Sequence, residues 1–230
     1  VYEPPSAAAV RGTILAFHYL GGSKAAIFPY VGNLVRHGYR IASFDYPNHG
    51  ESEDCPSSRY TFESDLRRFL EVLERKKMEG PYGAIGFSMG ASLALMAADF
   101  YPQVKAVVCD SGPLLHSRKY FLHVLRSKRE VNWVARAVFM ASYLFLMGFY
   151  PRERSMLRRL QRLRGLPMLY LHGRRDHIVP IDNARRAYAL SRSDNSRFVA
   201  VDRAHHLTNR ALLGPHYDQL VLQFFNRWIS

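Results

Sequence analysis

Six short apolar runs, separated by stretches with helical spacing, constrain the fold of this chain more than any other feature. The runs cover residues 13–17, 40–44, 82–87, 104–109, 168–171 and 197–201. Because each run is short and bounded by turn residues, we predict buried strands in a sheet that is covered on both faces. Helical patterns lie between the runs, most clearly over residues 61–78, 88–101, 182–190 and 215–229. This alternation predicts an α/β fold with a doubly wound, mostly parallel sheet.

One segment interrupts the alternation. Residues 113–165 contain no clear strand pattern, and we predict a helical insertion that divides the core into residues 1–112 and 166–230. The insertion has twelve lysines and arginines against two acids, so it carries most of the chain's net charge of +13. This local excess favours an anionic partner at the insertion, although a solvated helix face is the alternative. Charge alone does not predict a nucleic-acid partner, and we expect none.

Several classes of protein are disfavoured by simple counts. The two cysteines, Cys55 and Cys109, give neither a disulfide framework nor a zinc pattern. The apolar segment 137–150 is too short for a membrane span. No cluster has metal-ligand spacing and no glycine-rich phosphate loop is present, so we expect neither a metal nor a cofactor.

The chain begins at Val1 rather than Met, which we interpret as a removed leader or a trimmed end, so the localisation stays open.

A serine lies where the third predicted strand meets the following helix. Ser88 is the centre of the sequence GFSMG, and working residues of parallel sheets gather at the carboxyl ends of strands. A serine hydroxyl is a weak nucleophile that needs a base and an orienting carboxylate. Asp176 follows the fifth predicted strand, and the pair His205 and His206 follows the sixth. The order Ser, Asp, His predicts a catalytic triad.

Five motifs, each directly after a predicted strand, carry a resemblance to a known superfamily. They are FHYLGGS at 17–23, DYPNHGES at 45–52, GFSMG at 86–90, HGRRDHIVP at 172–180 and AHH at 204–206. The chain resembles the α/β-hydrolase superfamily, and most closely the branch of monoacylglycerol lipases, lysophospholipases and serine aminopeptidases. The resemblance covers nearly the whole chain apart from the basic insertion.

The resemblance implies a role for each triad residue. Ser88 would be the nucleophile and Asp176 the acid, with Asp110 after the fourth strand as the alternative acid. His206 is the favoured base because it comes after a short turn and precedes Leu207, and His205 is the alternative.

The resemblance also implies an oxyanion hole made by the backbone amides of Leu20 and Met89. Two positions depart from the family pattern, since Tyr19 and Asn48 stand where glycine is usual. Asn tolerates left-handed backbone, so the change at Asn48 is expected to be harmless. The other polar residues of these motifs are interpreted as structural: Asp45, His49, His172 and His177.

These observations predict a serine hydrolase that cleaves carboxylic esters through an acyl-enzyme on Ser88. The insertion would form a cap whose apolar segment accepts an acyl chain and whose basic flanks meet an anionic membrane surface. The expected substrate is a small, lipid-derived ester of the monoacylglycerol or lysophospholipid type. The alternatives are an acyl-CoA thioesterase and a non-catalytic hydrolase-fold protein that binds an anionic membrane or partner. An aminopeptidase is disfavoured because the insertion has almost no acids to hold a substrate amine.

Overall fold

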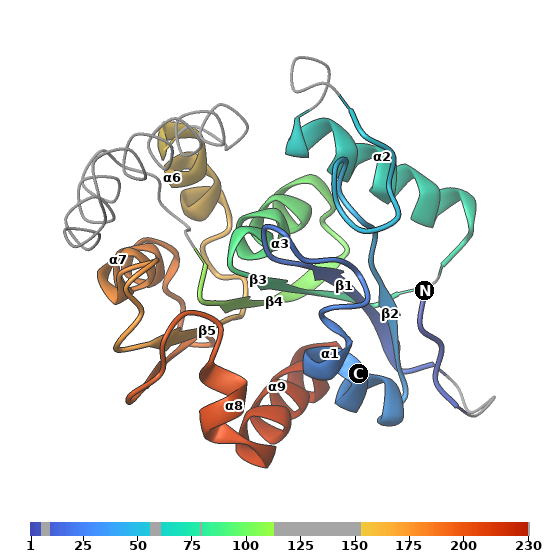
Figure 1. Cartoon of the computed structure of the whole chain (residues 1–230). Coiled ribbons are helices and arrows are strands. Elements are labelled where there is room, and N and C mark those ends of the chain that lie inside the picture. Colours follow the sequence, from blue (N-terminus) through green and yellow to red (C-terminus); the bar gives the residue numbers. More distant parts are fainter. Residues whose placement is uncertain (6–9, 56–60, 79, 113–152, 230) are drawn as a thin grey trace.

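The computed structural model describes residues 1–5, 10–55, 61–78, 80–112 and 153–229. Within these ranges, six strands form one sheet in the order β2-β1-β3-β4-β5-β6, and every neighbouring pair is parallel (Figure 1). The strands are β1 Gly12–Phe17, β2 Tyr39–Ala42, β3 Tyr82–Phe87, β4 Val104–Asp110, β5 Met168–Gly173 and β6 Arg197–Val201. The predicted parallel sheet is confirmed, with β2 ending two residues earlier than expected.

Helices cover both faces of the sheet, which explains the continuous apolar runs. On one face lie α2 (Phe62–Arg75), α3 (Met89–Phe100), α6 (Glu153–Arg162) and α7 (Ile181–Ser191). On the other lie α1 (Phe28–Arg36) and α9 (Pro215–Trp228), with the short α8 (Asn209–Leu213) before α9 (Figure 1). Every residue of β1, β3 and β5 is buried. A strand covered on both faces has no polar side to present to water, so its sequence does not alternate.

The strand order reverses between β1 and β3, since β2 lies on one side of β1 and the later strands lie on the other. In open parallel sheets, ligands bind outside the carboxyl ends of the strands at such a reversal. In the register of the sheet, Phe17 at the end of β1 is paired with Gly86, and Phe87 is paired with Asp110. The segments after β1, β3 and β4 therefore begin side by side.

The predicted cap is only partly within the described residues. Residues 113–152, including the apolar segment 137–150, lie outside them. The last part of the insertion forms α6, which packs on the core through the buried side chains of Met156 and Leu160. Among the helices that the structure describes, none is long and apolar enough to cross a membrane. A separate cap over residues 113–165 stays a prediction.

An ion-pair network with a buried centre, formed by Arg159 and Asp99, attaches α6 to two neighbouring helices. The guanidinium of Arg159 lies 2.5 Å from Asp99 Oδ2 on α3 and 3.1 Å from Glu63 Oε2 on α2. Arg162 donates two further hydrogen bonds to Asp99, of 2.8 and 2.7 Å. Burial alone would raise the pKa of Asp99, but the hydrogen bond from Arg162 and the charge of Arg159 lower it below the ordinary value. Asp99 is therefore a carboxylate at neutral pH.

Arg159→Leu is expected to lower the free energy of unfolding by about 2 kcal/mol, because it leaves the carboxylates of Asp99 and Glu63 with fewer partners. The side chains of Arg159 and Asp99 are only 6% and 8% exposed, so solvent cannot replace the lost contact. Arg162→Leu is the matched control. The Arg162 side chain is 56% exposed, and we expect its removal to cost less than about 1 kcal/mol. Equal losses in chemical denaturation would contradict this difference.

Candidate active site

Ser88 occupies a sharp turn between β3 and α3. Its φ of 49° and ψ of −118° are strained for a residue with a side chain. The turn is fixed by its amide, which donates a 2.8 Å hydrogen bond to the carbonyl of Asp110. A Cβ atom at Gly86 would overlap the backbone of Gly90, and one at Gly90 would overlap the carbonyl oxygen of Phe17. Both glycines of GFSMG are therefore required by close backbone approach.

His206, in the segment after β6, joins Ser88 to Asp176. Its Nε2 lies 2.8 Å from Ser88 Oγ, and its Nδ1 lies 2.8 Å from Asp176 Oδ2. An ionised carboxylate can only accept hydrogen bonds, so Nδ1 carries the proton and Nε2 presents a lone pair to the serine hydroxyl. This tautomer is the one in which an imidazole can take the proton from a nucleophilic serine.

Asp176 lies buried in the segment after β5, and both of its carboxylate oxygens accept hydrogen bonds. Its Oδ1 accepts hydrogen bonds from the amides of Ile178 and Val179, at 2.9 and 2.8 Å. His172 Nε2 lies 2.8 Å from the carbonyl of Val179 and 3.4 Å from Asp176 Oδ2. Burial raises the pKa of Asp176, but hydrogen bonds from His172 and His206 outweigh it and lower the pKa below its usual value. Asp176 is thus ionised when it faces His206.

The alternative base and the alternative acid have other partners. His205 is exposed, its ring lies 5.7 Å from that of His177, and its amide donates to Thr208 Oγ1. Asp110 is fully buried and accepts hydrogen bonds from Ser111, Asn209 and Tyr217. In the described contacts neither the His205 ring nor the Asp110 carboxyl group is hydrogen-bonded to Ser88, His206 or Asp176; Asp110 meets Ser88 only through its backbone carbonyl. Of each predicted pair, the structure brings His206 and Asp176 to Ser88.

Two backbone amides lie on segments that meet at the elbow. Met89 is the first residue of α3, where helix amides have no intrahelical acceptor and the dipole is positive. Leu20 lies in the turn after β1, which is closed by a 2.9 Å hydrogen bond from the amide of Gly22 to the carbonyl of Tyr19. Within the described part of the chain, neither the Leu20 nor the Met89 amide donates to another group. Neither amide is therefore engaged by another part of the described chain.

His18 holds the turn that contains Leu20. Its Nδ1 lies 2.8 Å from the carbonyl of Tyr19, and its Nε2 lies 3.4 Å from the amide of Tyr46. Burial lowers the pKa of His18 to about 4. The ring is therefore neutral at pH 7, which lets Nδ1–H donate while Nε2 accepts. The turn is thereby attached to the segment after β2.

The remaining motif residues have local, structural contacts. Asp45 accepts hydrogen bonds from the amide and the ammonium group of Lys24, at 2.5 and 2.7 Å, and from the amide of Glu51 at 3.0 Å. The backbone of Asn48 is left-handed, with φ of 63°, as its replacement of glycine requires. His49 Nδ1 donates to the carbonyl of Pro47. These contacts agree with the interpretation of Asp45 and His49 as residues that shape the loop.

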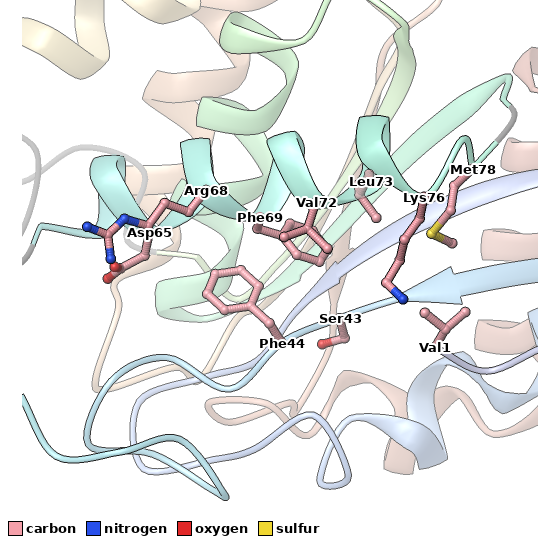
Figure 2. Close-up of a pocket in the computed structure, with 10 residues that line it drawn as sticks. All are labelled: Val1, Ser43, Phe44, Asp65, Arg68, Phe69, Val72, Leu73, Lys76 and Met78. Carbon is pink, nitrogen blue, oxygen red and sulfur yellow. The ribbon is translucent and has the colours of Figure 1, made fainter.

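A cavity of about 360 Å³ lies between α2 and the segment around β2. Figure 2 shows Phe44, Phe69 and Val72 in its middle. Its lining residues are Val1, Ser43, Phe44, Asp65, Arg68, Phe69, Val72, Leu73, Lys76 and Met78. Ser88, His206 and Asp176 are not among them, so this cavity is separate from the candidate active site. Over the described ranges, no group of three His, Cys, Asp or Glu residues is placed to hold a metal ion.

Comparison with known proteins gives one family match. The model of a family described as alpha/beta hydrolase fold matches residues 12–130, which is just over half of the chain. The chain is also 23% identical over 206 residues to the uncharacterized protein YfhR of Salmonella typhimurium. That match covers 84% of this chain but 64% of the relative, so the chain spans less than two thirds of the relative's length.

Solved structures show the same fold. The esterase Pf2001 of Pyrococcus furiosus superposes with a TM-score of 0.81 and 20% identity, over 97% of this chain and 83% of that chain. The monoacylglycerol lipase of Paleococcus ferrophilus superposes with a TM-score of 0.68 and 17% identity, over 94% of both chains. At these identities the likeness establishes the fold, and the fold class predicted from the sequence is confirmed.

Proposed function

The chain belongs to the α/β-hydrolase fold family, and on that premise we propose that it is a serine hydrolase that cleaves carboxylic esters. The observation that carries the proposal is the unbroken hydrogen-bond chain from Ser88 Oγ through His206 to Asp176, with both contacts at 2.8 Å. The strained turn presents Ser88 to His206, and the buried carboxylate of Asp176 orients His206. This arrangement activates a serine for acyl transfer.

The first half of the reaction acylates Ser88. His206 Nε2 takes the hydroxyl proton as Ser88 Oγ bonds to the acyl carbon, and the carbonyl oxygen becomes an oxyanion. The amides of Met89 and Leu20 donate to that oxygen, and one such donor contributes roughly 3 kcal/mol to transition-state stabilisation. The bond to the alcohol oxygen then breaks, and the imidazolium of His206 gives its proton to the leaving alkoxide. Asp176 stabilises the imidazolium between these two steps.

The second half releases the acid. The base is neutral again, so His206 takes a proton from a water molecule as the water oxygen bonds to the acyl carbon. The tetrahedral intermediate uses the same two amides. Its collapse breaks the bond to Ser88 Oγ, which recovers its proton from His206, and a carboxylic acid leaves. No metal or cofactor is needed in any step.

For the substrate, we propose a lipid-derived ester of the monoacylglycerol or lysophospholipid type. The strongest support is the sequence of the insertion, where an apolar segment at 137–150 is flanked by basic residues. Apolar side chains with basic flanks suit an acyl chain and an anionic membrane surface. The structural likeness to a monoacylglycerol lipase is consistent with this proposal.

A panel of glycerol monoesters with increasing acyl length tests the substrate. Each buried methylene contributes about 0.8 kcal/mol, so burial of only two of the methylenes added between acetyl and octanoyl esters would raise kcat/KM by about 10-fold, and burial of more would raise it further. Lysophospholipids and acyl-CoA thioesters of the same acyl length complete the panel, with Ser88→Ala as the blank. Preference for acetyl esters, together with no binding to anionic vesicles, would contradict a lipid substrate.

The alternatives give different outcomes in the same panel. An acyl thioesterase would favour acyl-CoA over the matched glycerol ester, since a basic insertion also suits the phosphate groups of coenzyme A. A non-catalytic binding protein would show no turnover of any ester, and its binding to anionic vesicles would be unchanged in Ser88→Ala.

A further inference from the structure

The residue directly after His206 is held by side chains from two other parts of the fold. Leu207 has a φ of 60°, an uncommon conformation for a residue with a branched side chain. Its amide donates to Ser111 Oγ at 3.3 Å, and its carbonyl accepts a hydrogen bond from the hydroxyl of Tyr30 at 3.2 Å. The backbone amide and the backbone carbonyl of Leu207 are therefore both restrained. A strained residue persists only where its surroundings hold it in place.

Ser111 is in turn oriented by a buried carboxylate. Its hydroxyl donates a 2.8 Å hydrogen bond to Asp110 Oδ1. Burial raises the pKa of Asp110 above the ordinary value, and hydrogen bonds from Tyr217, Ser111 and Asn209 oppose this by stabilising the carboxylate. The lone pairs of Ser111 Oγ are then free for the amide of Leu207 and for Asn209 Nδ2, which lies 3.1 Å away. Asp110 also accepts from Asn209 at 2.6 Å and from Tyr217 at 2.7 Å.

The same short segment also contacts the elbow. The carbonyl of Asp110 accepts the 2.8 Å hydrogen bond from the Ser88 amide, while the adjacent Ser111 hydroxyl accepts from Leu207. One turn at the end of β4 thus fixes the backbone of the candidate nucleophile and the backbone next to the candidate base. A fully buried carboxylate at this position would be costly without its hydrogen-bond donors.

We propose that Tyr30, Asp110 and Ser111 are positioning residues for His206. They hold Leu207 in its left-handed conformation, and this keeps the imidazole between Ser88 Oγ and Asp176 Oδ2. The expected effect on kcat rests on the proposed function. Its structural claim concerns the hydrogen bond between His206 and Asp176, which can be observed without a substrate. It also gives Asp110, the alternative acid of the sequence, a different role.

Ser111→Ala removes the acceptor for the Leu207 amide and is the first test. A displacement of reacting groups by about 1 Å costs on the order of 100-fold, so we expect a fall in kcat between about 10-fold and 100-fold. KM should change little, because no group that touches the substrate is lost. Tyr30→Phe removes the hydrogen bond to the Leu207 carbonyl and keeps the ring beside Phe87. This variant replaces Ser111→Ala as the test if Ser111→Ala does not fold.

A proton NMR spectrum supplies the readout that does not depend on turnover. The Nδ1 proton of His206, hydrogen-bonded to Asp176, should give a downfield resonance that is absent in His206→Gln. In Ser111→Ala this resonance should broaden or disappear. If wild type shows the resonance and Ser111→Ala loses it while no ester is hydrolysed, the positioning role stands and the proposed function fails.

Two comparisons separate positioning from a purely structural role. Ser191→Ala is the matched control, because Ser191 is also buried and hydrogen-bonded, on α7, and it should lose stability while keeping kcat and the resonance. Leu207→Gly added to Ser111→Ala should recover part of the lost kcat and of the resonance, because glycine adopts a positive φ without strain and needs the hydrogen bond from Ser111 less. The proposal is overturned if Ser111→Ala keeps wild-type kcat and resonance, or if Leu207→Gly recovers thermal stability while kcat and the resonance stay at the Ser111→Ala level.

Discussion

Ser88→Ala is expected to lower kcat for ester hydrolysis by roughly 10⁵-fold or more, because it removes the oxygen that receives the acyl group. Activity above the uncatalysed rate would persist only through substrate binding and the amides of Leu20 and Met89. The measurement is kcat on the best ester of the acyl-length panel. The fold should be retained, since the Ser88 side chain contacts only His206 among the described hydrogen bonds.

Ser92→Ala is the matched control for this substitution. Ser92 is a buried serine one turn further along α3, and its replacement should leave kcat close to the wild-type value. A Ser88→Ala variant that kept a tenth or more of wild-type kcat would mean that another group is the nucleophile.

Asp176→Asn is expected to lower kcat by about 10⁴-fold with little change in the fold. The reason lies in the hydrogen-bond donors around the carboxylate. The amides of Ile178 and Val179 both donate to Oδ1, so the asparagine oxygen should take that place and its NH₂ group should face His206 Nδ1. His206 would then carry its proton on Nε2 and could no longer accept one from Ser88.

Asp99→Asn is the control for the loss of a buried carboxylate. Asp99 lies on α3 in the ion-pair network with Arg159 and Arg162, and none of its described contacts involves the triad. Its replacement should lower stability and leave kcat unchanged. If Asp176→Asn lowered kcat no more than Asp99→Asn did, Asp176 would not be the residue that orients the base.

Much of the fold was predictable because it depends on local pattern. The strands β1, β3 and β5 are buried along their whole length and therefore produce apolar runs, and less fully buried runs mark β2, β4 and β6. Two helices were not singled out. The α1 helix begins with Phe28 and Pro29, and α8 has five residues, too few to show a helical period. Propensity and spacing are weak signals over such short segments.

The preference for His206 over His205 and for Asp176 over Asp110 came from the family resemblance, because the geometry that separates each pair is not visible in the sequence. His205 and His206 are adjacent, and which ring reaches Ser88 depends on the backbone of Leu207, whose positive φ nothing in a leucine predicts. That conformation depends on Ser111 and Tyr30, which are distant in the sequence. Similarly, Asp110 follows a strand as Asp176 does. The hydrogen-bond donors to Asp110, on Asn209 and Tyr217, are about a hundred residues away in the sequence and reach it only in the folded chain.

Covalent labelling by a fluorophosphonate is the most direct test of the central claim, that Ser88 is an activated nucleophile. The reagent needs only a reactive serine and no knowledge of the natural substrate. Mass spectrometry after digestion should place the label on Ser88, and Ser88→Ala should remain unlabelled. Absence of the label under conditions where control serine hydrolases react, or a label on another serine, would contradict the proposed mechanism.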